Sequence, residues 1–179
     1  MSTQVTTAAI NKLPPTWDLI DRINPKLQKD FGFRISVEGF DDLQGDLNSV
    51  LDFDLDELRD LNKSVTLWAS YLTDLIGYLE IAIGQYKNML HIYDHLDSIA
   101  IKDPDDFQRT APKYKIDSRN VPMAIKTVEE RKNELSAFVK CLKVLASSLA
   151  AYRDFMTASY YKTSALIVSS TSRAFNVAF

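Results

Sequence analysis

Apolar residues recur along two stretches of the chain with the alternating three-four spacing of a seven-residue repeat. A repeat held over several heptads is typical of long helices that pack through an apolar seam. The pattern therefore predicts two long helices, over residues 54–98 and 122–166. The first seam comprises Leu58, Leu61, Val65, Trp68, Leu72, Leu75, Leu79, Ala82, Tyr86, Met89, Tyr93 and Leu96, and the second comprises Leu135, Phe138, Leu142, Leu145, Leu149, Tyr152 and Met156.

Both long helices have start signals. Asp54 is a good N-cap, and Glu57 three residues later completes a capping box. Pro122 suits the first turn of the second helix. A helix of about 44 residues is roughly 65 Å long, which is too long to bury its seam within a small globule. The chain is therefore expected to be all-α, a long antiparallel two-helix coiled-coil hairpin with short N-terminal helices.

The segments before the first long helix are less regular. Residues 1–15 are expected to form a disordered leader, and residues 16–179 a single helical domain. Thr16 can cap a short helix over residues 17–27, which Asn24-Pro25 would kink or end. A second short helix is expected after Gly39, with Leu43, Leu47 and Leu51 on its apolar side.

Two further segments alternate apolar and polar residues. Residues 33–37 predict a short strand. Residues 164–179 are rich in Ser and Thr and end with Phe175, Val177 and Phe179 in alternation. This tail is compatible with a strand, with a segment inserted into a partner, or with a frayed terminus.

Small residues recur every seven positions away from the first seam, at Ser70, Gly77 and Gly84. Glycine inside a helix costs about 1 kcal/mol relative to alanine, so a stripe of it suggests close approach by another backbone. Apolar residues off the seams, such as Leu67 and Ile81, also exceed what a hairpin can cover. We expect a homo-oligomer with this stripe at its interface. Burial by the N-terminal elements and incidental glycines are the alternatives.

Composition limits the remaining choices. A chain of 179 residues, 46% of them hydrophobic, can bury one core. The single Cys141 excludes an internal disulfide, and His91 and His95 lack the partners of a metal motif. Phosphate-binding loops and nucleophile elbows do not occur. We therefore expect a protein that is not an enzyme, with neither a metal site nor a cofactor.

The sequence has no recognisable targeting segment. The N-terminus has no basic region leading into an apolar run, and no stretch approaches the roughly 20 apolar residues that span a bilayer. The expectation is a soluble cytoplasmic protein without membrane association, in the host cytoplasm if a phage encodes it.

Charge is distributed unevenly. Residues 37–60 carry nine acids and one base, a net charge of −8, whereas residues 107–179 carry twelve bases and five acids, a net charge of +7. Residues 107–119 interleave bases with Phe107 and Tyr114. Such a combination holds single-stranded nucleic acid, because cations neutralise phosphates while aromatic rings stack on bases. The candidate nucleic-acid-binding residues are Arg109, Lys113, Tyr114, Lys115, Arg119, Lys126, Arg131 and Lys132.

The layout of two long helices and a charged connection resembles that of phage recombination mediators, the UvsY-like proteins. The stretches that carry the resemblance are 57–62, 68–72, 79–80, 86–87 and 92–93 in the first helix, and 123–126, 130, 134–135 and 142–145 in the second. The resemblance implies a ring-forming helical protein that binds single-stranded DNA and helps to load a recombinase. In that family, the basic residues that contact DNA lie late in the first long helix. The corresponding stretch of this chain has Lys87, His91 and Tyr93, and Asp94 and Asp97 add negative charge to it.

Two functions are consistent with the sequence. The first is an oligomeric single-stranded DNA-binding protein, a recombination mediator of a phage or mobile element whose protein partner is a recombinase. The second is a structural or assembly protein, or an inhibitor of a host factor, that binds a protein partner through its helix faces.

Overall fold

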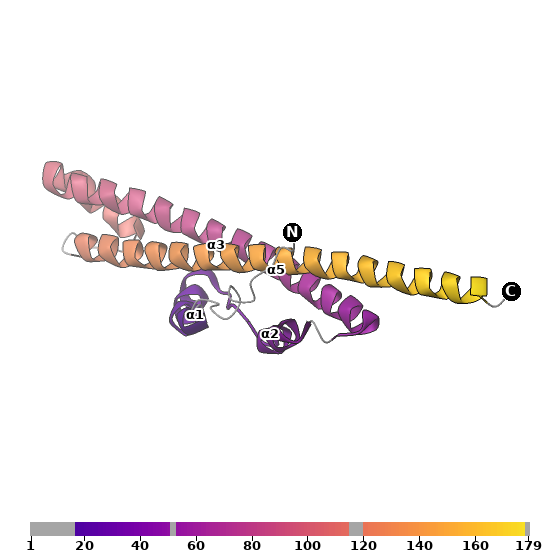
Figure 1. Ribbon diagram of the computed structural model, residues 1–179. Helices are drawn as coiled ribbons and strands as arrows, with labels where there is room; N and C mark the ends of the chain where they lie inside the picture. Colours follow the sequence, from indigo (N-terminus) through magenta and orange to yellow (C-terminus); the bar gives the residue numbers. More distant parts are fainter. Residues whose placement is uncertain (1–16, 51–52, 115–119, 178–179) are drawn as a thin grey trace. The chain divides into compact units, whose positions relative to one another are not determined.

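The computed structural model describes residues 17–50, 53–114 and 120–177 (Figure 1). All regular elements in these ranges are helices, and none is a strand, so the predicted all-α class is confirmed. The expected leader 1–15, the cap Thr16 and Leu51 lie outside the described residues. The elements are α1 (Trp17–Phe31), α2 (Phe40–Asn48), α3 (Leu55–Lys102), α4 (Pro104–Thr110), the short 3-10 helix η3 (Ala111–Tyr114) and α5 (Val121–Val177).

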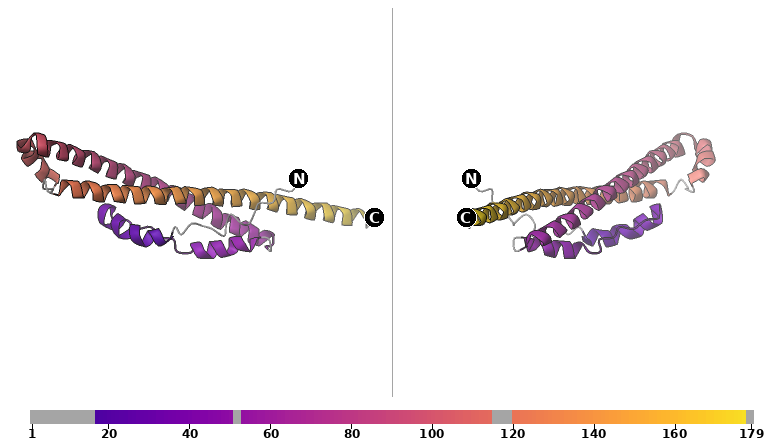
Figure 2. Two further views of the ribbon diagram at one scale, coloured as in Figure 1. Left: turned by 60° about the vertical axis from the view of Figure 1, so that its left-hand side comes forward. Right: turned by 90° about the vertical axis from the view of Figure 1, so that its right-hand side faces the viewer.

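The chain divides into two compact units, Met1–Ile35 with Leu75–Leu142 and Ser36–Asp74 with Lys143–Phe179. Helices α3 and α5 each contribute to both units. In the first unit, the second half of α3 runs alongside the start of α5 (Figures 1 and 2). Helices α4 and η3 connect the two, which gives this unit the character of a helical hairpin.

The predicted seams form the core of the first unit. Leu79, Tyr86 and Leu96 of α3 and Phe138 and Leu142 of α5 are each at most 2% exposed. Helix α1 contributes an apolar stripe to the same core, with its members four or three residues apart as a helix requires. These residues are Ile20, Ile23 and Leu27, and all three are buried.

The second unit has its own core. Leu58, Leu61, Val65 and Leu72 of α3 are buried in it, as are Leu145, Leu149 and Met156 of α5, and Phe40, Leu43 and Leu47 of α2. Phe40 meets Trp68 edge to face with ring centroids 5.0 Å apart. The Tyr71 ring meets Trp68 edge to face at 5.5 Å, and Tyr71 Oη donates to the Ser36 carbonyl at 2.7 Å. This aromatic series attaches α2 and its preceding loop to α3.

The predicted capping box at the start of α3 is present. Asp54 Oδ1 accepts from the Glu57 amide at 2.9 Å, and Glu57 Oε2 accepts in return from the Asp54 amide at 2.8 Å. Pro122 occupies the first turn of α5, as predicted. Both helices extend beyond the predicted ends, α3 to Lys102 and α5 to Val177. The chain leaves α3 at Asp103, whose side chain caps α4.

The strand predicted at residues 33–37 is wrong, because this segment has no regular structure. Helix α1 continues through Pro25 to Phe31, and Gly32 follows it with a φ of 77°, a left-handed conformation that glycine adopts without strain. Asn24 then holds the returning chain. Its Oδ1 accepts from the Ile35 amide at 2.8 Å, and its Nδ2 donates to the Ile35 carbonyl at 3.0 Å. Two bonds to one residue therefore replace the expected strand pairing.

The small-residue stripe is open within the described chain. A methyl group added at Gly77 or Gly84 would meet nothing within 4 Å. Beside the stripe, Leu67 is 71% exposed and Ile81 is 62% exposed. The N-terminal elements therefore leave this side of α3 uncovered over these residues.

Helix α5 is more apolar than the sequence analysis allowed. Over Val121–Lys162 it is long and apolar enough to cross a membrane, with a mean hydropathy of 1.4 in its most apolar 18-residue window. A third of that window is buried inside the protein. The expectation that no stretch approaches this length of apolar sequence is corrected accordingly.

Candidate functional site

The connection between the long helices folds onto a small apolar cluster. Leu96 of α3, Phe107 of α4, Ala111 of η3 and Val121 of α5 are all buried in it. Tyr93 and Ile125, among others, pack against its edge. We call α4, η3 and the first turns of α5 to residue 126 the tip, leaving residues 115–119 aside.

The tip presents several of the predicted nucleic-acid-binding residues. Arg109 has a side chain that is 75% exposed and lies 3.8 Å from the Asp106 carboxylate. Lys113 and Lys126 are exposed, and Tyr114 is 43% exposed. These four side chains face solvent on α4, η3 and α5, the helices that contribute Phe107, Ala111 and Val121 to the buried cluster. Lys115 and Arg119 lie outside the described residues.

Phe107 does not share this exposure. It is 8% exposed and fills the cluster beneath α4. Of the two aromatic residues in the predicted basic segment, Tyr114 can therefore stack on a ligand, whereas Phe107 anchors the tip. The alternation of bases with aromatics did not distinguish an anchor from a stacking residue.

Arg131, another predicted contact, is engaged within the fold. Its Nη1 lies 2.5 Å from Asp30 Oδ2, and the Arg131 side chain is 24% exposed. Tyr86 Oη donates to the same Asp30 oxygen at 2.7 Å. Phe31 stacks edge-on against the Tyr86 ring at a centroid distance of 5.1 Å. Lys132, next in sequence, is half-buried.

A second ion pair lies one helical turn away. Glu134 of α5 contacts Lys26 of α1 through Oε2, and Arg22 Nη2 lies 3.0 Å from its Oε1. A small cavity lies between the two pairs, lined by Ile23, Lys26, Leu27, Tyr86, Arg131, Glu134 and Leu135. Its volume of about 10 Å³ is close to the minimum that one water molecule requires. This polar cluster therefore fixes α1 on the hairpin and has no room for a substrate.

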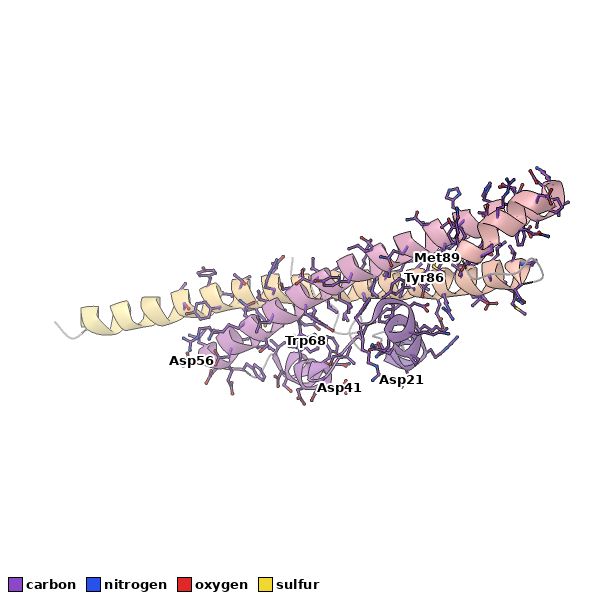
Figure 3. The ribbon with its side chains drawn as sticks, turned by 180° about the vertical axis from the view of Figure 1, so that it is seen from behind. Asp21, Asp41, Asp56, Trp68, Tyr86 and Met89 are labelled. Atoms are coloured by element: carbon purple, nitrogen blue, oxygen red, sulfur yellow. The ribbon has the colours of Figure 1, made fainter. Side chains whose placement is uncertain are left out.

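Burial raises the pKa of Tyr86 well above its ordinary value, and the hydrogen bond to Asp30 adds to the effect. The phenol therefore stays protonated and acts as a hydrogen-bond donor. It lies at a seam position where sequence reasoning assigned packing alone. Figure 3 places Tyr86 beside α1, on the side of α3 that this helix covers.

The acidic segment faces solvent over its described part. Asp41, Asp42 and Asp46 of α2 are exposed, and Figure 3 shows Asp41 and Asp56 projecting outward. Asp60 pairs with Lys63 at 2.7 Å, and this partner lowers the pKa of the Asp60 carboxyl. No group of three His, Cys, Asp or Glu residues that could hold a metal ion occurs among the described residues.

The residues that the resemblance to UvsY-like proteins would place at a DNA contact differ in their exposure. Lys87 and His91 are exposed on α3, whereas Tyr93 is half-buried against the tip cluster. No family model, curated protein or solved structure matches this chain.

Proposed function

We propose that this protein binds single-stranded DNA without catalysing a reaction, as an oligomeric recombination mediator of a phage or mobile element. The observation that carries the proposal is the tip. Arg109, Lys113, Tyr114 and Lys126 are exposed on α4, η3 and the start of α5, helices that share one buried apolar cluster, so cations and a stacking ring are offered on one connected part of the fold.

The proposal assigns the scaffold a supporting role. In it, α3 and α5 form an antiparallel coiled-coil hairpin, and copies associate through the open stripe of Ser70, Gly77 and Gly84. An oligomer repeats the tip, and several weak sites on one strand bind far more tightly than one. The negative charge of residues 37–60 repels a DNA strand. This repulsion favours binding of the strand at the basic residues of the tip. The protein partner would be a recombinase, and the site of action the cytoplasm.

Fluorescence anisotropy with a labelled single-stranded oligonucleotide at about 50 mM salt tests the proposal. The double variant Lys113→Ala/Lys126→Ala should weaken binding and make the salt dependence shallower, by about 0.7 in logarithmic slope for each lost phosphate contact. Lys29→Ala, an exposed lysine on α1, is the matched control and should bind like the wild type.

Light scattering on the same samples, with and without the oligonucleotide, reports the assembly. Wild-type protein that does not bind the oligonucleotide at low salt would overturn the proposal. If Lys113→Ala/Lys126→Ala binds the oligonucleotide as tightly as the wild type, the tip is not the binding site.

One observation favours a second function. Leu67 and Ile81 are mostly exposed beside the open glycines of α3, and such a face suits another helix. In this alternative the protein is an assembly factor or an inhibitor of a host factor. It predicts co-purification with one protein partner, lost on Ile81→Lys, and indifference to DNA.

A further inference from the structure

The two histidines of the chain, His91 and His95, lie one helical turn apart on α3. Both are exposed. Residues four positions apart on a helix are separated by about 40° around its axis and by about 6 Å along it. The two imidazole rings therefore lie on the same side of α3 and can reach one point in the solvent beside it.

The opposite side of α3 holds this pair in place. Tyr86 and Leu96, on either side of the pair in sequence, are each at most 2% exposed in the core of the first unit. Both lie at least about 100° around the helix from either histidine. Within the described residues, neither imidazole forms a hydrogen bond or an ion pair. The ring nitrogens are therefore open to a ligand.

The charge around the pair suits a cation. Asp94 lies between the two histidines in sequence and Asp97 follows them, whereas Lys87 is the one base from residue 87 to residue 97. Neither aspartate forms an ion pair within the part of the chain that the structure describes. The segment therefore has a net negative charge, which raises the local concentration of cations.

Two histidines at this spacing are a chelating pair for a transition-metal ion. The helical zinc sites of metalloproteases also place two histidines four residues apart, and imidazole nitrogen binds Zn²⁺ at about 2.0–2.1 Å. No third His, Cys, Asp or Glu joins the pair among the described residues. Because the pair is exposed, water can fill the remaining positions, as it fills the open position of catalytic zinc sites.

We infer that His91 and His95 form a binding site for a divalent transition-metal ion of the zinc and copper kind. One ion binds per chain, through a nitrogen of each ring. Copper should bind more tightly than zinc, and magnesium, which prefers oxygen ligands, should not bind. The inference departs from the expectation of a protein without a metal site, and it is independent of DNA binding.

Isothermal titration calorimetry of the full-length protein with ZnCl₂ tests the site, with MgCl₂ as the control ion. His95→Ala should bind Zn²⁺ at least about 10-fold more weakly than the wild type, since loss of a partner outside the ligand shell alone costs about 10- to 100-fold. The urea midpoint gives a second readout. It should rise with ZnCl₂ in the wild type but not in His95→Ala, because an ion that binds the folded helix better than the unfolded chain stabilises the fold.

Two further substitutions in the His95→Ala protein form a matched comparison. Lys87→His places a histidine four residues before His91, which restores the spacing and should restore the affinity for Zn²⁺. Gln85→His places it six residues before His91, about 120° away around the helix, and should not restore the affinity. Lys87 and Gln85 are both exposed, so neither change removes a buried side chain.

The results separate a chelating pair from loose binding by single histidines. Wild-type protein that binds Zn²⁺ no more tightly than His95→Ala would overturn the inference. Equal recovery of affinity with Gln85→His and Lys87→His would show that any second histidine suffices, and it would overturn the chelate. Failure of Lys87→His to restore binding would contradict the role of the helical spacing. Oligonucleotide binding, measured without added metal, is unaffected by each of these outcomes.

Discussion

Asp30 accepts hydrogen bonds from Tyr86 and Arg131, which lie 56 and 101 positions away in the sequence. Sequence reasoning placed Tyr86 in an apolar seam and Arg131 on a nucleic-acid surface, and it gave Asp30 no role. Nothing in the local pattern indicates which of many acids will meet a particular base, because such pairs form only when distant helices pack. Helical periodicity is a local signal and does not contain this information.

Replacing Asp30 should therefore destabilise the protein. Asp30→Ala leaves the half-buried Arg131 without its partner and Tyr86 without its acceptor, so we expect the free energy of unfolding to fall by about 2 kcal/mol. Asp21→Ala removes an exposed acid from the same helix and should cost less than about 0.5 kcal/mol. Urea denaturation of both variants compares them. Equal losses would show that the ion pair does not stabilise the fold.

Tyr86 makes stability depend on pH in the alkaline range. In the unfolded chain the phenol ionises near pH 10, whereas in the fold its raised pKa keeps the proton bound. Above about pH 10 the unfolded state binds fewer protons than the folded state, so stability falls as pH rises, by up to about 1.4 kcal/mol per pH unit. Below that pH, Tyr86 contributes no pH dependence.

Tyr86→Phe isolates this contribution. The variant loses a hydrogen bond at every pH, but it should lose less additional stability than the wild type between pH 9 and about pH 11. Urea midpoints across this range measure the difference. Parallel curves for the two proteins would contradict a raised pKa at this residue.

Among the elements, the long helices were the most predictable. Their heptad repeats identified the core correctly because burial on a helix follows its period, and Leu72, Leu79, Leu142 and Leu149 are all nearly inaccessible. The strand at residues 33–37 failed for the opposite reason. Five alternating residues are too few to distinguish a strand from an irregular segment. Hydrogen bonds between the Asn24 side chain and the Ile35 backbone take the place of strand pairing.

The seam should dominate the stability of α3. Leu79 is 0% exposed and Ile81, two positions later, is 62% exposed. Leu79→Ala should cost about 2–5 kcal/mol because it leaves a cavity, whereas Ile81→Ala should change stability by less than about 0.5 kcal/mol in the monomer. Thermal or urea unfolding compares the two variants. Similar losses in the free energy of unfolding would mean that the buried side of α3 is not the one that contains Leu79.

The candidate site was predicted in part. Arg109, Lys113, Tyr114 and Lys126 are exposed as a ligand surface requires, but Phe107 and Arg131 serve the fold. The composition of a segment shows which residue types are present in it. Whether each side chain is buried in the fold or exposed to a ligand depends on which side of a short helix packs against the core.

At the scale of the whole molecule, the open glycine stripe gives a test of assembly. Gly77→Leu places a large side chain where nothing lies within 4 Å in one copy, so the monomer should remain folded. If copies associate closely through this stripe, the variant should have a lower mass in light scattering at unchanged helix content. Tyr78→Leu, at a position that is 65% exposed and lies about 100° around α3 from Gly77, is the control. An unchanged mass for Gly77→Leu would remove the stripe from the interface.

The ion pairs between α1 and α5 have a consequence for how the chain is made. Lys26 meets Glu134 across 108 positions, and Asp30 meets Arg131 across 101. During synthesis at about 5–20 residues per second, α1 is therefore complete roughly 5–20 s before its partners emerge from the ribosome. Its stripe of Ile20, Ile23 and Leu27 remains without its final cover for that interval, so newly made chains should be most prone to capture by chaperones before residue 134 is translated.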